Sequence, residues 1–301
     1  MEQIKQRFLL VSDMHDTTEE THEELKKIYP EANTSIAAGD AFGHTQREMI
    51  EKVYEAVIGE HAKHPLDGVL ILGDLSIDDW DSRHLPLNYC RKFKEDCMDR
   101  LPCPSYAQPG NHDSYPDEMW REVFGYDRQF VVEFGDTVFV MADTFQKVPA
   151  KGASGSPYNP VDEDFLRSEL EKYKGKNVFL CAHHINKKDT DELCEVIRNS
   201  PELKCMFRGH THHNAVIDMG EECGNKPLVD IGGYAYNGMV IDGKYTFGIF
   251  DEKWAWGYEI LELTETTAHL YHVKPDMHYV ADNGTFDVPH TVSGEFEIKL
   301  K

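Results

Sequence analysis

The run Val69-Leu70-Ile71-Leu72-Gly73-Asp74 constrains the fold of this chain more than any other stretch. Four consecutive large aliphatic residues predict a strand that is buried on both faces. Gly73 then permits a tight turn, and Asp74 stands at the carboxyl end of the strand. A strand followed by Gly-Asp is most often only a turn, but ligands of open α/β sheets bind outside the carboxyl ends of the strands. Asp74 is therefore a candidate ligand-binding residue.

Four other apolar runs end in the same way, each with polar side chains directly after a predicted strand. The strands are expected at residues 8–11, 105–107, 178–182 and 204–207. The side chains that follow them are Asp13 with His15, Asn111 with His112, His183, and His210 with His212. Because parallel strands end at one edge of a sheet, we expect these side chains to converge with Asp74.

The order of the predicted elements indicates an α/β protein. Helices are expected near residues 45–57, 87–101, 162–173 and 191–198, and a hairpin at 130–142. After residue 213 the pattern changes to short strands, at 214–218, 227–231, 245–250, 256–263, 267–273 and 294–300. The segments 16–44 and 147–160 are expected to be loops. The simplest arrangement is a layered α/β sandwich in a single domain, residues 1–272. A C-terminal strand extension, residues 273–301, would pack on this domain.

Composition excludes several functional classes. The chain has 301 residues and a formal net charge of −23, which opposes binding to a long nucleic acid. No apolar run approaches the roughly 18 residues that a membrane-spanning helix needs. Seven cysteines without a Cys-x-x-Cys pair predict reduced thiols in a cytoplasmic protein. The charge does not oppose a small phosphate ester if bound metal ions supply positive charge.

The converging side chains form a set of carboxylate, imidazole and amide groups. This donor set suits divalent Mn, Fe, Zn, Co or Ni ions. Seven candidate ligands are more than one ion with an open position needs, whereas two ions bridged by a shared carboxylate would use all of them. Asp74 lies on the strand nearest the middle of the set and is the natural bridge. The seven candidates are Asp13, His15, Asp74, Asn111, His183, His210 and His212.

With these residues in place, the sequence resembles the calcineurin-like metallophosphoesterase superfamily. The matching blocks are Asp13-x-His15, Gly73-Asp74, Gly110-Asn111-His112-Asp113, His183, and Gly209-His210-Thr211-His212, and they follow one another in the family's order. The resemblance implies a four-layer αββα sandwich of two mixed β-sheets flanked by helices. It covers residues 8 to 213, about two-thirds of the chain.

The resemblance also implies a role for each residue. Asp13, His15 and His212 would hold the first metal ion, and Asn111, His183 and His210 the second. Asp74 would bridge the two ions together with a hydroxide. His112 would contact the phosphate and protonate the leaving oxygen, with Asn111 also touching the substrate. From its position alone, Asp113 follows His112 directly and is a candidate to orient it, although adjacent side chains often point apart. By the same reasoning, His184 and His213 are expected to contact substrate or solvent and not metal.

Two differences from other branches of the superfamily indicate which branch this sequence resembles. Protein phosphatases of the superfamily have Gly-Asn-His-Glu and a later Asp-Arg-Gly, where this chain has Asp113 and Leu75-Ser76-Ile77-Asp78. Purple acid phosphatases have a tyrosine ligand where Ile77 stands. The motifs of this sequence are similar to those of the branch of cyclic-nucleotide phosphodiesterases and acid-sphingomyelinase-like enzymes.

The expected function is hydrolysis of a small phosphodiester by in-line attack of a metal-bridging hydroxide. One alternative is a phosphomonoesterase or nucleotide pyrophosphatase that uses the same pair of ions. A second, of a different class, is a non-catalytic scaffold with the same fold. The residues leave the substrate, the metals and the oligomeric state open.

Overall fold

The structure is a computed structural model. It describes residues 2–16, 49–75, 89–146, 155–186, 189–234, 237–241, 244–248, 256–281 and 284–300. The start of the helix expected near residues 45–57, Asp78 and most of the two expected loops, 16–44 and 147–160, lie outside these residues. None of the described helices is long and apolar enough to cross a membrane.

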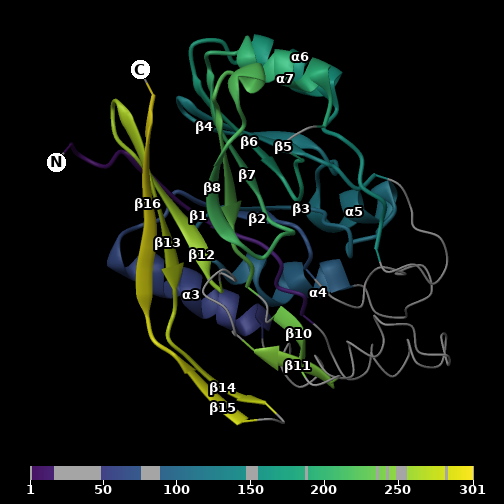
Figure 1. The fold of residues 1–301 in the computed structure, drawn as a ribbon, viewed down its shortest axis with the longest axis vertical. Helices are drawn as coiled ribbons and strands as arrows, with labels where there is room; N and C mark the ends of the chain where they lie inside the picture. The colour runs from purple at the N-terminus through teal and green to yellow at the C-terminus, as the bar shows by residue number, and fades with distance from the viewer. Residues whose placement is uncertain are drawn as a thin grey trace.

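Two six-stranded mixed sheets form the centre of the fold (Figure 1). The first has the order β16-β13-β12-β1-β2-β3, in which β1, β2 and β3 run parallel and the other neighbours are antiparallel. Its strands are β1 (Gln6–Val11), β2 (Gly68–Leu72), β3 (Ser105–Gln108), β12 (Tyr258–Leu263), β13 (Thr267–Lys274) and β16 (Thr291–Lys299).

The second sheet has the order β4-β5-β6-β7-β9-β8, with β5, β6, β7 and β9 parallel and an antiparallel strand at each edge. Its strands are β4 (Phe130–Phe134), β5 (Thr137–Ala142), β6 (Asn177–Ala182), β7 (Leu203–Arg208), β8 (Asn214–Asp218) and β9 (Pro227–Ile231). Two separate hairpins are β10 (Asn237–Ile241) with β11 (Lys244–Gly248), and β14 (Met277–Ala281) with β15 (Gly284–Val288).

Helices cover the outer faces of both sheets, which gives four layers (Figure 1). The first sheet is covered by α3 (Met49–Lys63), α4 (Tyr89–Asp96) and α5 (Asp117–Phe124), and the second by α6 (Glu163–Lys172) and α7 (Asp191–Arg198). Two short 3-10 helices are η2 (Met98–Arg100) and η3 (Glu221–Cys223). The expected αββα arrangement of two mixed sheets flanked by helices is confirmed.

The strand pattern explains the three layers of core. Side chains of a strand point alternately to opposite faces. Leu70 and Leu72 therefore pack between the two sheets, while Val69 and Ile71 pack against the helices. All four are fully buried, as the uninterrupted aliphatic run predicted. The helix expected near residues 162–173 is also confirmed as α6, which Asp162 caps by accepting a hydrogen bond from Phe165 N at 3.0 Å.

One expectation about the cysteines is wrong. Cys194 on α7 and Cys223 on η3 form a disulfide, with their Cα atoms 4.4 Å apart. The other five cysteines are free thiols. The two partners are 29 residues apart in the sequence, and only the packing of η3 against α7 brings them together.

Candidate metal centre

The predicted ligands converge at the carboxyl ends of β1, β2, β3, β6 and β7. Loop hydrogen bonds hold the first two of these ends in register. Asp13 N donates to Gly73 O at 3.0 Å, and His15 N donates to Asp74 O at 3.1 Å. Across the sandwich, His210 N donates to Asp13 Oδ2 at 2.8 Å. The two sheets are thus joined at this edge by the backbone of the residues that carry the site.

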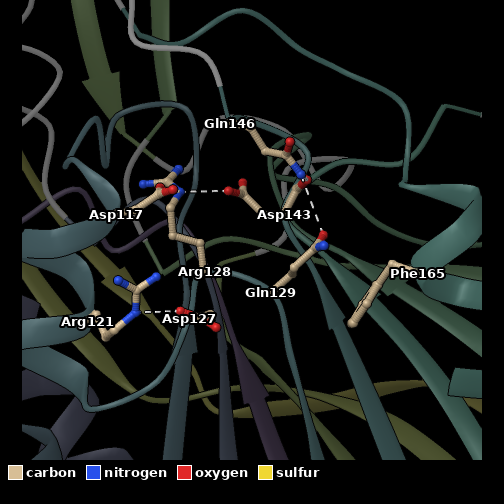
Figure 2. A pocket seen from close by; sticks show the side chains of 8 residues that line it. All are labelled: Asp117, Arg121, Asp127, Arg128, Gln129, Asp143, Gln146 and Phe165. Atoms are coloured by element: carbon tan, nitrogen blue, oxygen red, sulfur yellow. Dashed lines mark hydrogen bonds and ion pairs between the residues drawn. The ribbon is translucent and has the colours of Figure 1, made fainter. Parts of the chain in front are cut away.

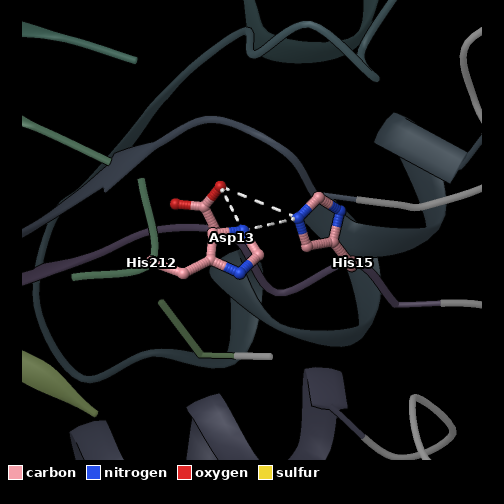
Figure 3. A group of neighbouring side chains, drawn as sticks. All are labelled: Asp13, His15 and His212. Carbon is pink, nitrogen blue, oxygen red and sulfur yellow. Dashed lines mark hydrogen bonds and ion pairs between the residues drawn. The ribbon is translucent and has the colours of Figure 1, made fainter. Parts of the chain in front are cut away.

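The first group consists of Asp13, His15 and His212 (Figure 3). Asp13 Oδ1 lies 3.2 Å from His212 Nε2 and 3.7 Å from His15 Nε2. The two imidazole Nε2 atoms are 3.1 Å apart. One carboxylate oxygen and two ring nitrogens therefore face a common point, which is the arrangement that a divalent cation requires.

The second group consists of Asp74, His183 and His210, with Asn111 beside them. Asp74 Oδ2 lies 3.2 Å from His183 Nε2, and Asn111 Oδ1 lies 3.2 Å from the same nitrogen and 2.9 Å from His210 Nδ1. His183 Nδ1 lies 2.6 Å from the carbonyl oxygen of Leu72. A ring nitrogen that donates to a carbonyl leaves the opposite nitrogen free to ligate, as is typical of metal-bound histidines.

Asp74 lies between the two groups. Its Oδ2 is 3.7 Å from His15 Nε2 in the first group and 3.2 Å from His183 Nε2 in the second. Its other oxygen, Oδ1, accepts a hydrogen bond from His112 N at 2.9 Å. This position agrees with the bridging role that was predicted for Asp74, which stays a prediction.

His112 is the residue whose role the geometry leaves most open. Its ring is 5.1 Å from the ring of His15, and it forms a third set of neighbouring donor atoms with His15 and Asp74. Its Nδ1 atom is buried and has no hydrogen-bond partner among the described residues. His112 thus has the position of a proton donor beside the centre, but it also lies within reach of a ligand site.

The charges at this edge are unbalanced without a cation. Burial raises the pKa of Asp13 and of Asp74, but neighbouring histidines lower both well below the usual range. Burial lowers the pKa of His183, and the two carboxylates outweigh it and raise the value to about 9. Burial and nearby histidines lower the pKa of His15 and of His210 to about 3.

The donor set fits divalent metal ions. Asp13 and Asp74 are 0% and 2% exposed, and they pair with histidines but with no lysine or arginine of the described chain. Asp13 Oδ1 and His15 Nδ1 are buried without a hydrogen-bond partner among these residues. Buried charges in proteins are normally paired or coordinate metals, so this cluster of two carboxylates calls for added positive charge.

The backbone is strained at the predicted ligands. Five of them have positive φ angles: Asp13 (55°), His15 (46°), Asp74 (52°), His210 (63°) and His212 (53°). Among the other described residues, Asn225 is the only non-glycine with such an angle. Each such residue costs about 1–3 kcal/mol and persists where the surroundings over-determine it, most often at functional sites.

Two glycines are required by close approach. A Cβ atom on Gly110 would overlap the carboxylate and the backbone nitrogen of Asp74, and one on Gly73 would lie 2.6 Å from Gly110 N. Gly73 also has a φ of 88°, which an L side chain rarely adopts. The turns after β2 and β3 are therefore pressed against each other directly beneath the centre.

The expectation that Asp113 orients His112 is not what the structure shows. The Asp113 carboxylate accepts hydrogen bonds from Leu75 N, at 3.1 and 3.3 Å, and from Gly110 N at 2.8 Å. Burial and the nearby Asp74 raise its pKa to about 7. Asp113 thus ties the turn after β2 to the turn after β3, and His112 Nδ1 has no hydrogen-bond partner among the described residues.

Gln108 is a site residue that sequence reasoning missed. It is fully buried at the end of β3. With its amide oriented to satisfy both neighbours, it donates to Cys181 O at 3.1 Å and accepts from His183 N at 2.6 Å. Gln108 thus fixes the backbone of a predicted ligand from the opposite sheet, and no local sequence pattern signals such a contact.

His184 and His213 belong to none of the three groups of donor atoms. The ring of His184 lies 4.5 Å from the ring of His210 and 5.0 Å from that of Tyr158, and its Nε2 atom is 3.1 Å from Asn186 Oδ1. His184 therefore borders the centre without entering it, and its expected contact with substrate stays a prediction.

Comparisons with solved structures find chains of similar fold at low identity. Vps29 of Entamoeba histolytica, a single mutant, is 12% identical with a TM-score of 0.38, covering 96% of this chain and 99% of that one. Vps29 of Chaetomium thermophilum is 12% identical with a TM-score of 0.39, covering 99% and 100%. GAP50 of Plasmodium, described as the anchor in the inner membrane complex, is 11% identical with a TM-score of 0.49, covering 96% and 90%. At these values none carries information about function.

The comparison with curated proteins found no significant match. The model of one protein family, described as calcineurin-like phosphoesterase, matches residues 6–214. That range holds β1 to β7 with every strand end described above, and it is more than half of the chain. The chain therefore belongs to the calcineurin-like phosphoesterase family.

Proposed function

We propose that this protein is a metal-dependent phosphoesterase with two divalent ions in its centre. The observation that carries the proposal is the pair of buried carboxylates, Asp13 and Asp74. They face five imidazoles and pair with no lysine or arginine of the described residues. A structural ion-pair network would contain a permanent cation. A centre that binds metal ions instead keeps its carboxylates free for them.

Seven residues would hold the ions. Asp13, His15 and His212 would bind the first, and Asn111, His183 and His210 the second, with Asp74 shared. When bound, the two ions would neutralise the phosphoryl oxygens and lower the pKa of a water molecule towards neutrality. Gln108 and the Leu72 carbonyl would fix the orientation of His183, as partners of metal-bound histidines generally do.

His112 would supply a proton to the leaving oxygen. Its backbone nitrogen is bonded to Asp74 Oδ1 at 2.9 Å, so the residue is held at a fixed position beside the shared carboxylate. Histidine is the side chain that most often transfers protons in catalysis. General acid catalysis of this kind contributes roughly 10²–10⁴-fold to a rate.

We infer that the substrate is a phosphodiester. The chain has a formal charge of −23, and such a field repels anions at a distance. A diester carries one negative charge, whereas a phosphate monoester carries about −1.5 to −2 at pH 7. Because the described residues offer Asp13 and Asp74 no lysine or arginine, the ester with the smaller charge is better matched to this centre.

A panel of esters and metals tests the proposal. Metal-free protein is loaded in turn with Mn²⁺, Fe²⁺, Zn²⁺, Co²⁺ or Ni²⁺, and hydrolysis of bis-p-nitrophenyl phosphate is compared with that of p-nitrophenyl phosphate. We expect metal-dependent turnover that is faster on the diester, and a loss of at least about 100-fold in Asp74→Asn, since changes in mere supporting residues already cost 10–100-fold. Asp164→Asn, which alters an exposed carboxylate on α6, is the matched control and should keep full activity.

Two other outcomes would redirect the proposal. Faster turnover of the monoester would assign the centre to monoesters or to nucleotide pyrophosphates. A protein that binds two ions and hydrolyses neither ester would contradict the enzymatic proposal and favour a non-catalytic scaffold.

A further inference from the structure

A buried arginine, Arg128, lies behind the candidate metal centre. It is 7% exposed and its Nε atom is 2.6 Å from Asp143 Oδ2, while Asp143 itself is 1% exposed (Figure 2). The carboxylate of Asp117, which is 70% exposed, lies 3.7 Å from the same Nε atom. The guanidinium carbon is 5.7 Å from the centre of the Trp120 ring. One buried carboxylate thus neutralises one buried guanidinium.

The guanidinium binds the backbone of two different loops. Its Nη1 atom donates to Tyr115 O at 2.7 Å and lies 3.5 Å from Asp113 O. Its Nη2 atom donates to Phe145 O at 3.1 Å. Asp143 completes the link, because its Oδ1 atom accepts from Phe145 N at 2.9 Å. The loop after β3 and the loop after β5 are therefore held together by one side chain.

Both loops border the proposed second ion. The loop after β3 carries Asn111 and His112 immediately before the residues whose carbonyls Arg128 binds. The loop after β5 carries Phe145, whose ring is 5.4 Å from the ring of His183 and 5.8 Å from that of His210. A shift of either loop would move Asn111 or the two histidines relative to each other.

Only arginine supplies this set of contacts. A planar guanidinium has five N–H donors in a fixed fork, whereas a lysine ammonium is a single point with three. Arg128 uses its donors on one carboxylate and on carbonyls of two loops. A lysine would retain the charge opposite Asp143 but could not bind both loops in the same geometry.

We propose that Arg128 is a positioning residue for the metal centre: by clamping the loop of Asn111 and His112 to the loop of Phe145, it sets the arrangement of the second ion's ligands. This inference rests on the function proposed above. It adds a residue that lies outside the predicted ligand set.

The chain offers a matched control in the same hollow. Arg121 pairs with Asp127 at 2.6 Å on the surface, where both are more than half exposed, and it lines the same cavity of about 540 Å³ as Arg128. Exposed pairs of this kind are worth little to stability. Arg121→Lys therefore changes the same residue type in the same hollow without touching either loop.

The first test measures binding of Mn²⁺ to metal-free protein by calorimetry at 20 °C, with melting curves to establish that each variant is folded. In Arg128→Lys we expect the second ion to bind about 10–100-fold more weakly, the usual effect of losing a partner that supports the ligands. The first ion should bind with unchanged affinity, as should both ions in Arg121→Lys. Unchanged affinity for both ions in a folded Arg128→Lys protein, with only a lower melting temperature, would overturn the proposal.

Chemical rescue distinguishes positioning from a general loss of stability. The hollow over Arg128 is large enough to admit a free guanidinium ion, so 20 mM guanidinium chloride should restore part of the Mn²⁺ affinity of Arg128→Ala. Sodium chloride at the same concentration should not. Equal effects of the two salts would contradict a specific clamp. If Arg128→Ala does not fold, the lysine variant alone decides.

The Mn²⁺ measurement also separates this inference from the proposed function. If the wild-type protein binds two ions but hydrolyses no ester, the enzymatic proposal fails. The positioning role of Arg128 is then still supported if the second ion binds more weakly to Arg128→Lys, and contradicted if that affinity is unchanged.

Discussion

Binding of divalent ions should release a proton from His183. In the metal-free protein the two carboxylates raise the pKa of His183 to about 9, so that the ring is protonated at pH 7. Its Nδ1 atom is directed at the Leu72 carbonyl, and the Nε2 atom that faces Asp74 carries the second proton. A metal ion can bind this nitrogen only after the proton leaves.

The size of the effect follows from the pKa values. His15 and His210, with pKa values lowered to about 3, are already neutral, and the carboxylates of Asp13 and Asp74 are already ionised. At His183 one proton therefore competes with the metal. The dissociation constant should rise about tenfold for each unit by which the pH lies below about 9, or about 1.4 kcal/mol per unit. From pH 6.5 to 8.5 the second ion should thus bind about 100-fold more tightly.

Calorimetry with Mn²⁺ in buffers of different ionisation enthalpy counts the released protons directly. We expect His183→Gln to release about one proton fewer per chain than the wild-type protein at pH 7.5 when both sites fill. His210→Ala should weaken binding and leave the number of released protons unchanged. Equal numbers of protons released by the wild-type protein and by His183→Gln would refute the charge assignment.

The same proton stabilises the metal-free fold. Because the folded pKa of His183 lies above the ordinary value of 6.5, its contribution is fully present below pH 6.5 and is lost as the pH rises through about 9. The melting temperature of metal-free protein should therefore fall between pH 6.5 and 9.5, and His183→Gln should show a smaller fall.

Three substitutions give further expected outcomes. Asp74→Asn should lose more metal than His15→Ala, because the shared carboxylate serves both ions. Elemental analysis after dialysis measures the metal content of each variant. A greater loss of metal in His15→Ala would mean that Asp74 is not the bridge. Gly110→Ala should weaken Mn²⁺ binding by at least about tenfold, since its Cβ would overlap the Asp74 carboxylate. Gly59→Ala, at an exposed position of helix α3 where a Cβ meets nothing within 4 Å, should instead raise the free energy of unfolding in denaturant by about 0.5–1 kcal/mol. His112→Ala should keep both ions but hydrolyse an alkyl ester roughly 10²–10⁴-fold more slowly, with a much smaller loss of rate on a nitrophenyl ester. Equal losses of rate on the two esters would mean that His112 acts by positioning the phosphate. Loss of a bound ion would make His112 a metal ligand.

The parts of the fold that local sequence determines were predicted from it. The strand β2 could be recognised because an uninterrupted aliphatic run is buried on both faces and ends at Gly73. Helix α7 was predicted at residues 191–198 and is observed at Asp191–Arg198, where Thr190 accepts a hydrogen bond from Leu193 N. Such elements carry their own start and stop signals.

Elements without those signals were missed. Helix α5 (Asp117–Phe124) was not predicted: it has only eight residues, and Pro116 at its start makes no side-chain cap. It is held instead by burial of Trp120 and Phe124 against the first sheet. The helix expected to run to Leu101 ends at Asp96 as α4 and continues only as the short η2.

The candidate site divides in the same way. Its donors could be predicted because each follows a strand, and the carboxyl ends of parallel strands meet. The residues that support the donors could not, because Gln108, Asp113 and Arg128 act across loops or between sheets. Their partners are backbone atoms, which leave no pattern in the sequence. The disulfide between Cys194 and Cys223 is a third case of a contact that only tertiary packing creates.

Anomalous diffraction from crystals soaked in Mn²⁺ tests the central claim most directly. The two-ion centre predicts two peaks per chain, roughly 3.5–4 Å apart, one beside Asp13, His15 and His212 and the other beside Asn111, His183 and His210, with Asp74 between them. A single peak at saturating Mn²⁺, or peaks away from these residues, would contradict the account.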